Sequence, residues 1–133
     1  MTGFLDTNVV VRYLTGEPSG QAEQAAEIID GTPELYVTGV VLAETAYVLM
    51  SAYHVARQVV IDHLIAFLRK ENIAVFGLDE RLVLHGLLLC RSSGRVSVAD
   101  TMVWTAARSA GVDIVYSFDR RFPEDGIKVR RSA

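Results

Sequence analysis

Four acidic residues carry the chemistry that this sequence suggests: Asp6, Glu44, Asp100 and Asp119. Carboxylates gathered in one crevice repel one another, more strongly as water is excluded, unless some are protonated or a divalent cation lies between them. Ligation by carboxylate oxygens alone favours a hard ion such as Mg²⁺ or Mn²⁺. Such an ion can activate water and stabilise charge in phosphodiester cleavage. If folding brings the four acids together, we expect a metal site for cutting nucleic acid.

The elements that would position these acids alternate along the chain. Short apolar segments predict strands at 4–5, 35–37, 73–76, 114–116 and 127–129. Between them, helical spacing and capping residues predict helices over 9–14, 21–30 (with Ser19 as N-cap), 38–53, 56–70, 80–91 and 97–110. This alternation predicts an α/β fold, a three-layer α/β/α sandwich with a short, mostly parallel central sheet.

The predicted topology gives the acids a common place. Ligands of open α/β sheets bind beyond the carboxyl ends of the parallel strands, where Asp6, Ser117 and Asp119 are expected. Glu44 lies about two turns into its helix and Asp100 in the first turn of its own, so both can point back over that edge. Hydroxyl and amide groups would orient ligands or waters around the ion; the candidates are Thr7, Asn8, Thr38 and Ser117.

Each acid also has a structural interpretation. Asp100 lies three residues after Ser97, the spacing of a capping box, and an acid there suits the helix dipole. Asp119 can shape a turn. Glu44 is a lone acid in an apolar segment, so it reaches either solvent or a partner. Spacing alone leaves these alternatives open.

Composition predicts one domain over residues 1–133. Half of the 133 residues are apolar, enough for one core. No apolar stretch approaches the roughly 20 residues of a membrane span, and no signal peptide is evident, so a cytoplasmic protein without membrane contact is expected. The single cysteine, Cys90, lies in an apolar run and is expected to be buried. The same burial is expected of Trp104, in the core or at a dimer interface.

Charge is distributed unevenly. Residues 1–90 hold 5 Lys/Arg and 11 Asp/Glu, whereas residues 91–133 hold 8 and 5. A basic C-terminal third can attract phosphates, with Arg95, Arg120 and Arg121 as candidate RNA contacts. Solvated surface charge explains any one of these arginines equally well.

Four landmarks in order resemble the PIN-domain ribonucleases, most closely the VapC type of toxin. They are Leu5-Asp6-Thr7-Asn8 before an apolar helix, Ala43-Glu44 on a helix after Val37-Thr38, the helix start Ser97-Val98-Ala99-Asp100, and Ser117-Phe118-Asp119-Arg120-Arg121-Phe122. The resemblance covers essentially the whole chain. The last motif of this family has Thr or Ser, one further residue and then Asp. In this chain Phe118 fills the middle position, which is a mild departure.

The resemblance implies roles for individual residues. Asp6, Glu44 and Asp100 match the three acids that hold the catalytic metal, Asp119 a fourth and more variable position, and Ser117 the hydroxyl of the last motif. It also implies Mg²⁺- or Mn²⁺-dependent endonucleolytic cleavage of RNA and a homodimer. A cognate antitoxin is expected to inhibit the enzyme by placing its C-terminal segment in the groove beside the active site.

Two other classes of protein fit parts of this pattern. A response-regulator receiver or a haloacid-dehalogenase-like phosphotransfer protein also has acids at strand ends. This chain, however, lacks a second Asp two residues after Asp6 and a Lys after the strand that ends at Ser117. A PIN-like binding module with a silent active site is the other alternative, and the presence of all four acids argues against such decay.

Overall fold

The computed structural model describes all of residues 1–133, and pairs of helices separate the first four strands. In chain order the elements are β1 (Thr2–Phe4), α1 (Thr7–Thr15), α2 (Ser19–Gly31), β2 (Glu34–Val37), α3 (Gly39–Ser51), α4 (Arg57–Leu68), β3 (Ile73–Val75), α5 (Glu80–Ser93), α6 (Val98–Ser109), β4 (Ile114–Tyr116) and β5 (Lys128–Arg130). Each predicted element is present within a few residues of its expected bounds. The α/β class with short parallel strands is confirmed.

Local sequence explains where several helices begin. Thr38 caps α3 by accepting a hydrogen bond from the backbone N of Val41 at 3.2 Å, and Ser97 caps α6 in the same way through the backbone N of Asp100 at 3.0 Å. Both caps satisfy a backbone donor that the first helical turn leaves free. The prediction for Ser19 was wrong. It is the first residue of α2, after Pro18, and no side chain caps this helix.

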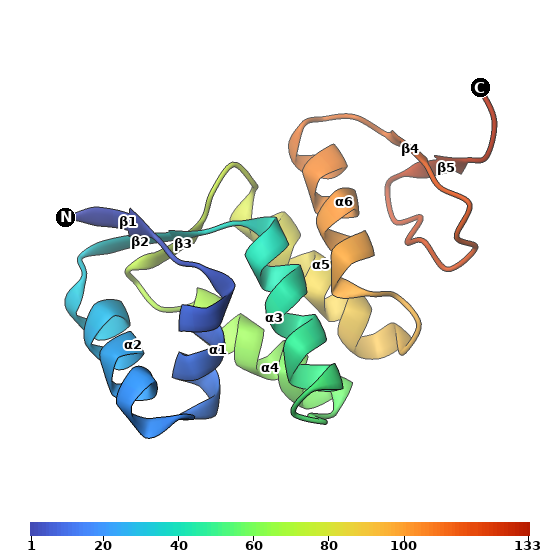
Figure 1. Cartoon of the computed structure of the whole chain (residues 1–133). Helices are drawn as coiled ribbons and strands as arrows, with labels where there is room; N and C mark the ends of the chain where they lie inside the picture. The colour runs from blue at the N-terminus through green and yellow to red at the C-terminus, as the bar shows by residue number, and fades with distance from the viewer.

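Three strands form a parallel sheet in the order β1-β2-β3. The alternation of strand side chains buries Leu35, Val37, Ile73 and Val75 on one face, where they join the main hydrophobic core. Helices pack on that face (Figure 1). On the other face Phe4, Tyr36 and Phe76 form an aromatic cluster, with ring centroids 5.2 to 5.8 Å apart. Phe4 and Phe76 are each more than half exposed, so no helix covers this cluster.

The last two strands form a second parallel sheet, separate from the first. We call residues 114–130 the C-terminal β-unit. It has a small core of its own, in which Trp104 of α6 packs with Val115, Phe122 and Ile127. Figure 1 shows β1 and this unit at opposite ends of an elongated molecule, with α3, α5 and α6 between them. The sequence did not predict this division into two sheets.

The helices that carry the C-terminal β-unit are packed closely. A Cβ added at Gly86 of α5 would clash with the side chain of Thr101 and lie 2.9 Å from Oγ1 of Thr105, both on α6. Glycine therefore allows these two helices to approach each other. Trp104 is fully buried and Cys90 is buried beside Thr101, as the sequence predicted. No helix is long and apolar enough to cross a membrane.

Candidate functional site

Two of the four acids lie together. Asp100 occupies the first turn of α6, and Asp119 follows β4, so the start of a helix and the end of a strand bring their carboxyl groups into contact. Ser117 supports this arrangement, because its Oγ accepts a hydrogen bond from the backbone N of Asp119 at 3.1 Å. The backbone N of Ser117 donates to the carbonyl of Arg130 on β5 at 3.1 Å, which fixes the turn to the second sheet.

Arg121 binds Asp119 closely. Its Nε donates to Oδ1 of Asp119 at 3.1 Å, and its backbone N donates to the same oxygen at 2.8 Å. These hydrogen bonds hold the pKa of Asp119 below its usual value. One cation therefore already compensates one of the two carboxylates.

The pKa of the neighbouring acid, Asp100, is shifted in the opposite direction. Burial raises the pKa of Asp100, and the negative charge of Asp119 raises it further, against smaller lowering effects from Ser97 and Arg121. The two carboxyl groups thus have different proton affinities. Arg121 therefore favours the ionised form of Asp119 more than that of Asp100.

Asp6 lies in a different place, at the carboxyl end of β1. Its Oδ1 accepts a hydrogen bond from the backbone N of Thr7 at 2.8 Å, and it serves as the N-cap of α1. The side chain is exposed. Because β1 belongs to the three-stranded sheet and Asp119 follows the other sheet, the two strand ends do not meet.

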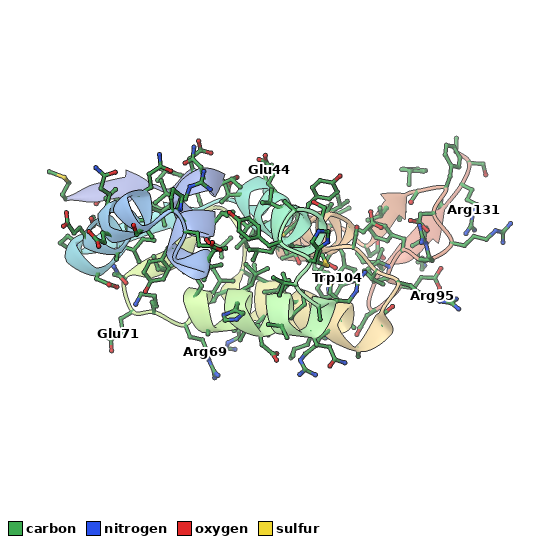
Figure 2. The ribbon with its side chains drawn as sticks, turned by 60° about the horizontal axis from the view of Figure 1, so that its bottom comes forward. Glu44, Arg69, Glu71, Arg95, Trp104 and Arg131 are labelled. Carbon is green, nitrogen blue, oxygen red and sulfur yellow. The ribbon has the colours of Figure 1, made fainter.

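Glu44 is the fourth acid, and its side chain is exposed on α3. Figure 2 shows it projecting away from the ribbon. Its neighbour Thr45 is completely buried, and its hydroxyl has no hydrogen-bond partner. The side chain of Glu44 therefore reaches solvent, the simpler of the two alternatives that its apolar surroundings left open.

The hydroxyl and amide residues expected around the metal, like the four acids, do not all lie at one place. Thr38 uses its Oγ1 to cap α3. The Oγ1 of Thr7 is buried without a hydrogen-bond partner, directly after Asp6. Asn8 is exposed on the first turn of α1. Ser117 lies beside the Asp100–Asp119 pair, because its Oγ accepts from the backbone N of Asp119.

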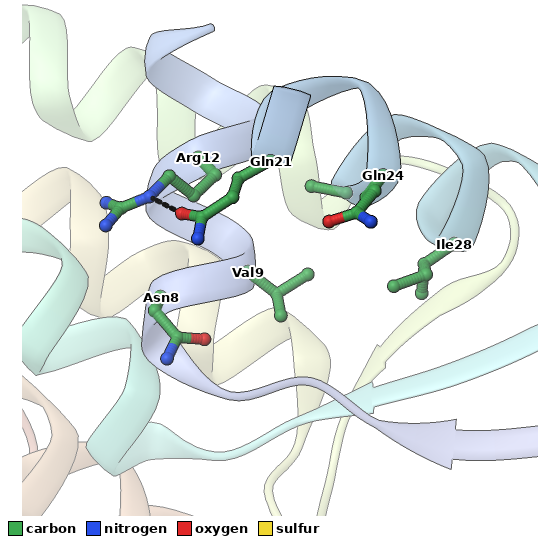
Figure 3. Close-up of a pocket in the computed structure, with 7 residues that line it drawn as sticks. Asn8, Val9, Arg12, Gln21, Gln24 and Ile28 are labelled. Carbon is green, nitrogen blue, oxygen red and sulfur yellow. Dashed lines mark hydrogen bonds between the residues drawn. The ribbon is translucent and has the colours of Figure 1, made fainter. Parts of the chain in front are cut away.

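Asn8 instead lines a pocket between α1 and α2 with a volume of about 270 Å³ (Figure 3). Arg12, Gln21 and Gln24 give it a polar rim, and Nε of Arg12 donates to Oε1 of Gln21 at 2.8 Å. Sequence reasoning did not identify this pocket. The only available signal was the pair of glutamines at helical spacing, which also suits a solvated helix face.

The side chains at this site are in part suited to binding a hard divalent cation. Asp100 and Asp119 supply carboxylate oxygens, the ligands that such ions prefer, and a cation between them would relieve their repulsion. However, no group of three or more Asp, Glu, His or Cys side chains that could hold a metal is present in one copy of the chain. The chain therefore brings together two of the four expected acids.

The candidate RNA-contacting arginines lie on the basic part of the chain. Arg95 and Arg120 are exposed, whereas Arg121 is engaged with Asp119. Figure 2 shows Arg95 and Arg131 at the same end of the molecule as the C-terminal β-unit. Positive charge thus lies near the two paired acids.

The fold and the site together define an α/β protein with acids at strand ends and helix starts. The profile of the PIN domain family matches residues 3–126, and the chain belongs to this family. The match includes all four acids. No curated protein sequence matches the chain significantly.

Two solved structures are similar to this chain. One is Mycobacterium tuberculosis VapC20, described as a sarcin-ricin loop cleaving toxin, with 19% identity and a TM-score of 0.46 over 90% of this chain and 92% of that one. The other is VapBC2 from Rickettsia felis bound to a DNA fragment from its promoter, with 14% identity and a TM-score of 0.40 over 98% of both chains.

Proposed function

We propose that this protein is a metal-dependent endoribonuclease and the toxin of a toxin–antitoxin pair. Membership of the PIN family over residues 3–126 is the observation that carries the proposal. The contact between Asp100 and Asp119 supports it, because it gathers two carboxylates from distant parts of the sequence. The proposed metal ligands are Asp6, Glu44, Asp100 and Asp119, with Mg²⁺ or Mn²⁺ as the ion. Bound to these acids, the ion would supply an activated water for hydrolysis of the RNA backbone.

The chain's own residues would perform the remaining tasks. Ser117 holds the turn that presents Asp119, and Thr7, Asn8 and Thr38 are proposed to orient ligands or waters near Asp6. Arg95, Arg120 and Arg121 are proposed to contact RNA phosphates. Arginine suits this role because its planar guanidinium can bind two phosphate oxygens at once.

Cleavage of labelled RNA tests the activity directly. We expect cleavage with Mn²⁺ or Mg²⁺ and none with excess EDTA. Asp6→Asn and Asp100→Asn should each abolish cleavage. The circular dichroism spectrum should change little, because the side chain of Asp6 is exposed and that of Asp100 is only partly buried. Asp113→Asn is the matched control: this exposed acid has no assigned role. Equal activity with and without EDTA would contradict the proposal.

The biological role requires a second test. The proposed partners are an RNA substrate, a cognate antitoxin protein and a second copy of the chain. Induced expression of the protein should arrest bacterial growth, expression of Asp100→Asn should not, and co-expression of the antitoxin should restore growth. Growth arrest by both forms would show that the effect does not depend on the proposed active site.

A binding module with a silent active site is the second candidate. The observation that favours it is the lack of a three-acid group within one copy. This candidate predicts no metal-dependent RNA cleavage under any condition, together with tight binding of a partner that Asp100→Asn leaves unchanged. The cleavage assay with the EDTA control distinguishes the two functions.

A further inference from the structure

We propose that the open face of the C-terminal β-unit binds single-stranded RNA, and that one base stacks on Phe118 beside the phosphodiester to be cleaved. The inference rests on the proposed function, because it concerns the substrate of the same acids. Five residues make up the open face: Tyr116, Phe118, Lys128, Arg130 and Arg131, all of them exposed. Four of these, the two aromatic residues and the two arginines, line one pocket with a volume of about 280 Å³.

The strands of the C-terminal β-unit have one covered face and one open face. Val115 of β4 and Val129 of β5 pack in the small core on the covered face. Tyr116 is the register partner of Arg130, and paired residues of neighbouring strands project to the same side, so both lie on the open face. Lys128 is exposed on that face, two residues before Arg130. The two strands therefore place an aromatic ring and two cations on one surface, without an acid among them.

Phe118 continues the open face beyond β4. The backbone N of Ser117 still donates to the carbonyl of Arg130 at 3.1 Å, so the chain remains extended after the strand. Phe118 lies two residues after Tyr116 and lines the same pocket. Its side chain is 85% exposed, whereas Phe122 in the following turn is buried. The turn thus supplies one phenylalanine to the core and leaves the other available to a ligand.

Phe118 is also held next to the proposed metal ligands. It directly precedes Asp119, with about 3.8 Å between the two Cα atoms. The Oγ of Ser117 accepts from the backbone N of Asp119 at 3.1 Å, and Nε of Arg121 donates to the Asp119 carboxylate at 3.1 Å. These hydrogen bonds fix the backbone on both sides of the ring. A base stacked on Phe118 therefore holds its own phosphodiester close to Asp119 and to Asp100, which contacts Asp119.

Aromatic rings beside arginines suit a single strand of RNA better than a duplex. Unpaired bases can stack on such rings while arginines bind the phosphates between them. In a duplex the bases already stack on one another. The ion pairs that arginines form in this structure involve Arg91 and Arg121, so Arg130 and Arg131 can both bind phosphate. Figure 2 shows Arg131 projecting from this end of the molecule.

The other exposed aromatic cluster has a different charge beside it. Phe4, Tyr36 and Phe76 lie together on the three-stranded sheet. The hydroxyl of Tyr36 donates to Oε1 of Glu34 at 2.5 Å, and a carboxylate there repels phosphate. Phe76 is 56% exposed. It is therefore a matched control for Phe118, because it is the same type of residue at a surface that does not favour RNA.

Binding of a short, unstructured RNA tests the proposed surface. The RNA carries a fluorescent label, and its anisotropy is measured in EDTA so that no metal-dependent cleavage occurs. We expect Phe118→Ala to weaken binding about tenfold, within the range for loss of one base–aromatic stack. Phe118→Trp keeps a ring and should retain the wild-type affinity, and Phe76→Ala should not change it. Equal affinities of Phe118→Ala and the wild type, or no binding by the wild type, would overturn the inference.

Removing single bases from the RNA identifies the stacked position. We expect one abasic position to weaken binding to the wild type about tenfold and binding to Phe118→Ala much less, because the base and the ring are lost as a pair. Phe118→Trp gives a direct signal, since RNA should quench its indole fluorescence while the wild type, whose Trp104 is fully buried, should not respond. Losses that simply add would show that Phe118 contacts no base. A duplex of the same sequence should bind equally to Phe118→Ala and the wild type.

The salt dependence of binding tests the contribution of Arg130. Loss of one phosphate contact should reduce the slope of log affinity against log salt by about 0.7 for a single strand. We expect this reduction in Arg130→Gln and an unchanged slope in Phe118→Ala. Arg69→Gln is the control, at an exposed arginine far from the C-terminal β-unit (Figure 2). An unchanged slope in Arg130→Gln would contradict the phosphate contact.

Failure of this inference can be distinguished from failure of the proposed function. If the wild type cleaves RNA but Phe118→Ala binds RNA normally, the open face is not the binding surface and the proposed function stands. If the wild type binds RNA through Phe118 but never cleaves it, the proposed function fails and the binding surface stands. A Phe118→Ala form that binds RNA normally but is not inhibited by the antitoxin would assign the open face to a protein partner, and would overturn the inference.

Discussion

Gly86 on α5 lies against Thr101 on α6, and the contact leaves no room for even one methyl group at residue 86. This contact holds the helix that carries both Asp100 and the C-terminal β-unit. We expect Gly86→Ala to lower the free energy of unfolding by about 2 kcal/mol, because overpacking a filled core typically costs roughly 1–3 kcal/mol. Urea denaturation followed by circular dichroism measures the change.

Two further variants test whether the contact between residues 86 and 101 causes the loss of stability in Gly86→Ala. Gly31→Ala is the matched control, because a Cβ there meets nothing within 4 Å, and it should leave the unfolding midpoint nearly unchanged. Thr101→Ser removes the obstructing methyl group but keeps the hydroxyl that contacts Cys90. Added to Gly86→Ala, it should recover part of the lost stability. Equal midpoints for Gly86→Ala and the wild type would show that the helices separate without cost.

Trp104→Phe should loosen the C-terminal β-unit while leaving the three-stranded sheet intact. The substitution removes the hydrogen bond from Nε1 to the carbonyl of Asp125 and part of the small core. The expected loss is about 2 kcal/mol, from one lost hydrogen bond and a smaller buried ring; Nη1 of Arg108 still donates to the same carbonyl at 3.1 Å. Amide hydrogen exchange should accelerate in β4 and β5 and stay unchanged in β2. Tyr47→Phe, at an exposed tyrosine of α3, is the control.

The local elements were predictable because they depend on neighbouring residues. Thr38 and Ser97 cap helices through side chains three residues before the donor. The sequence predicted that all four acids would meet at one edge of the sheet, and the structure brings together only Asp100 and Asp119. Strand pairing was not predictable, because whether β4 lies beside β1 depends on how α6 packs. The close approach of α5 and α6 at Gly86 could not be predicted from the sequence either, because a glycine within a helix has many possible explanations.

Arg121→Gln should tighten Mn²⁺ binding and weaken RNA cleavage. Arg121 competes with a cation for Asp119, to which it donates from Nε and from its backbone N. Its removal should increase Mn²⁺ affinity about threefold, a small factor because exposed ion pairs are weak. Arg120→Gln removes the same charge without touching Asp119 and should change Mn²⁺ affinity less. Weaker Mn²⁺ binding by Arg121→Gln would show that the arginine orders the site instead.

The pH dependence of Mn²⁺ binding should change in the same variant. Arg121 lowers the pKa of Asp119, so Asp119 is ionised at a lower pH in the wild type than it would be alone. Without Arg121 its pKa returns toward the ordinary value. The onset of Mn²⁺ binding on raising the pH should therefore move to higher pH in Arg121→Gln. An onset at unchanged pH would show that ionisation of Asp119 does not limit Mn²⁺ binding.

Asp100→Asn should stabilise the protein at neutral pH even though it abolishes the proposed activity. Burial and the charge of Asp119 raise the pKa of Asp100 in the folded state. The ionised carboxylate is thus less favourable in the folded chain than in the unfolded one, and the penalty is present in full above the folded-state pKa. We expect a rise in melting temperature of roughly 2 °C at pH 7, modest because the group is partly exposed.

The higher melting temperature of Asp100→Asn should disappear in acid. This pH dependence distinguishes an electrostatic cause from better packing of the amide. As the pH falls through the folded-state pKa, wild-type Asp100 takes up a proton and loses its penalty, so its stability approaches that of the variant. Below the unfolded-state pKa the two melting temperatures should coincide. Asp113→Asn, measured across the same range by calorimetry, shows the effect of removing an acid from the surface. A difference for Asp100→Asn that stays constant from pH 7 to pH 3 would mean that the amide packs better than the carboxyl, and that repulsion from Asp119 is not the cause.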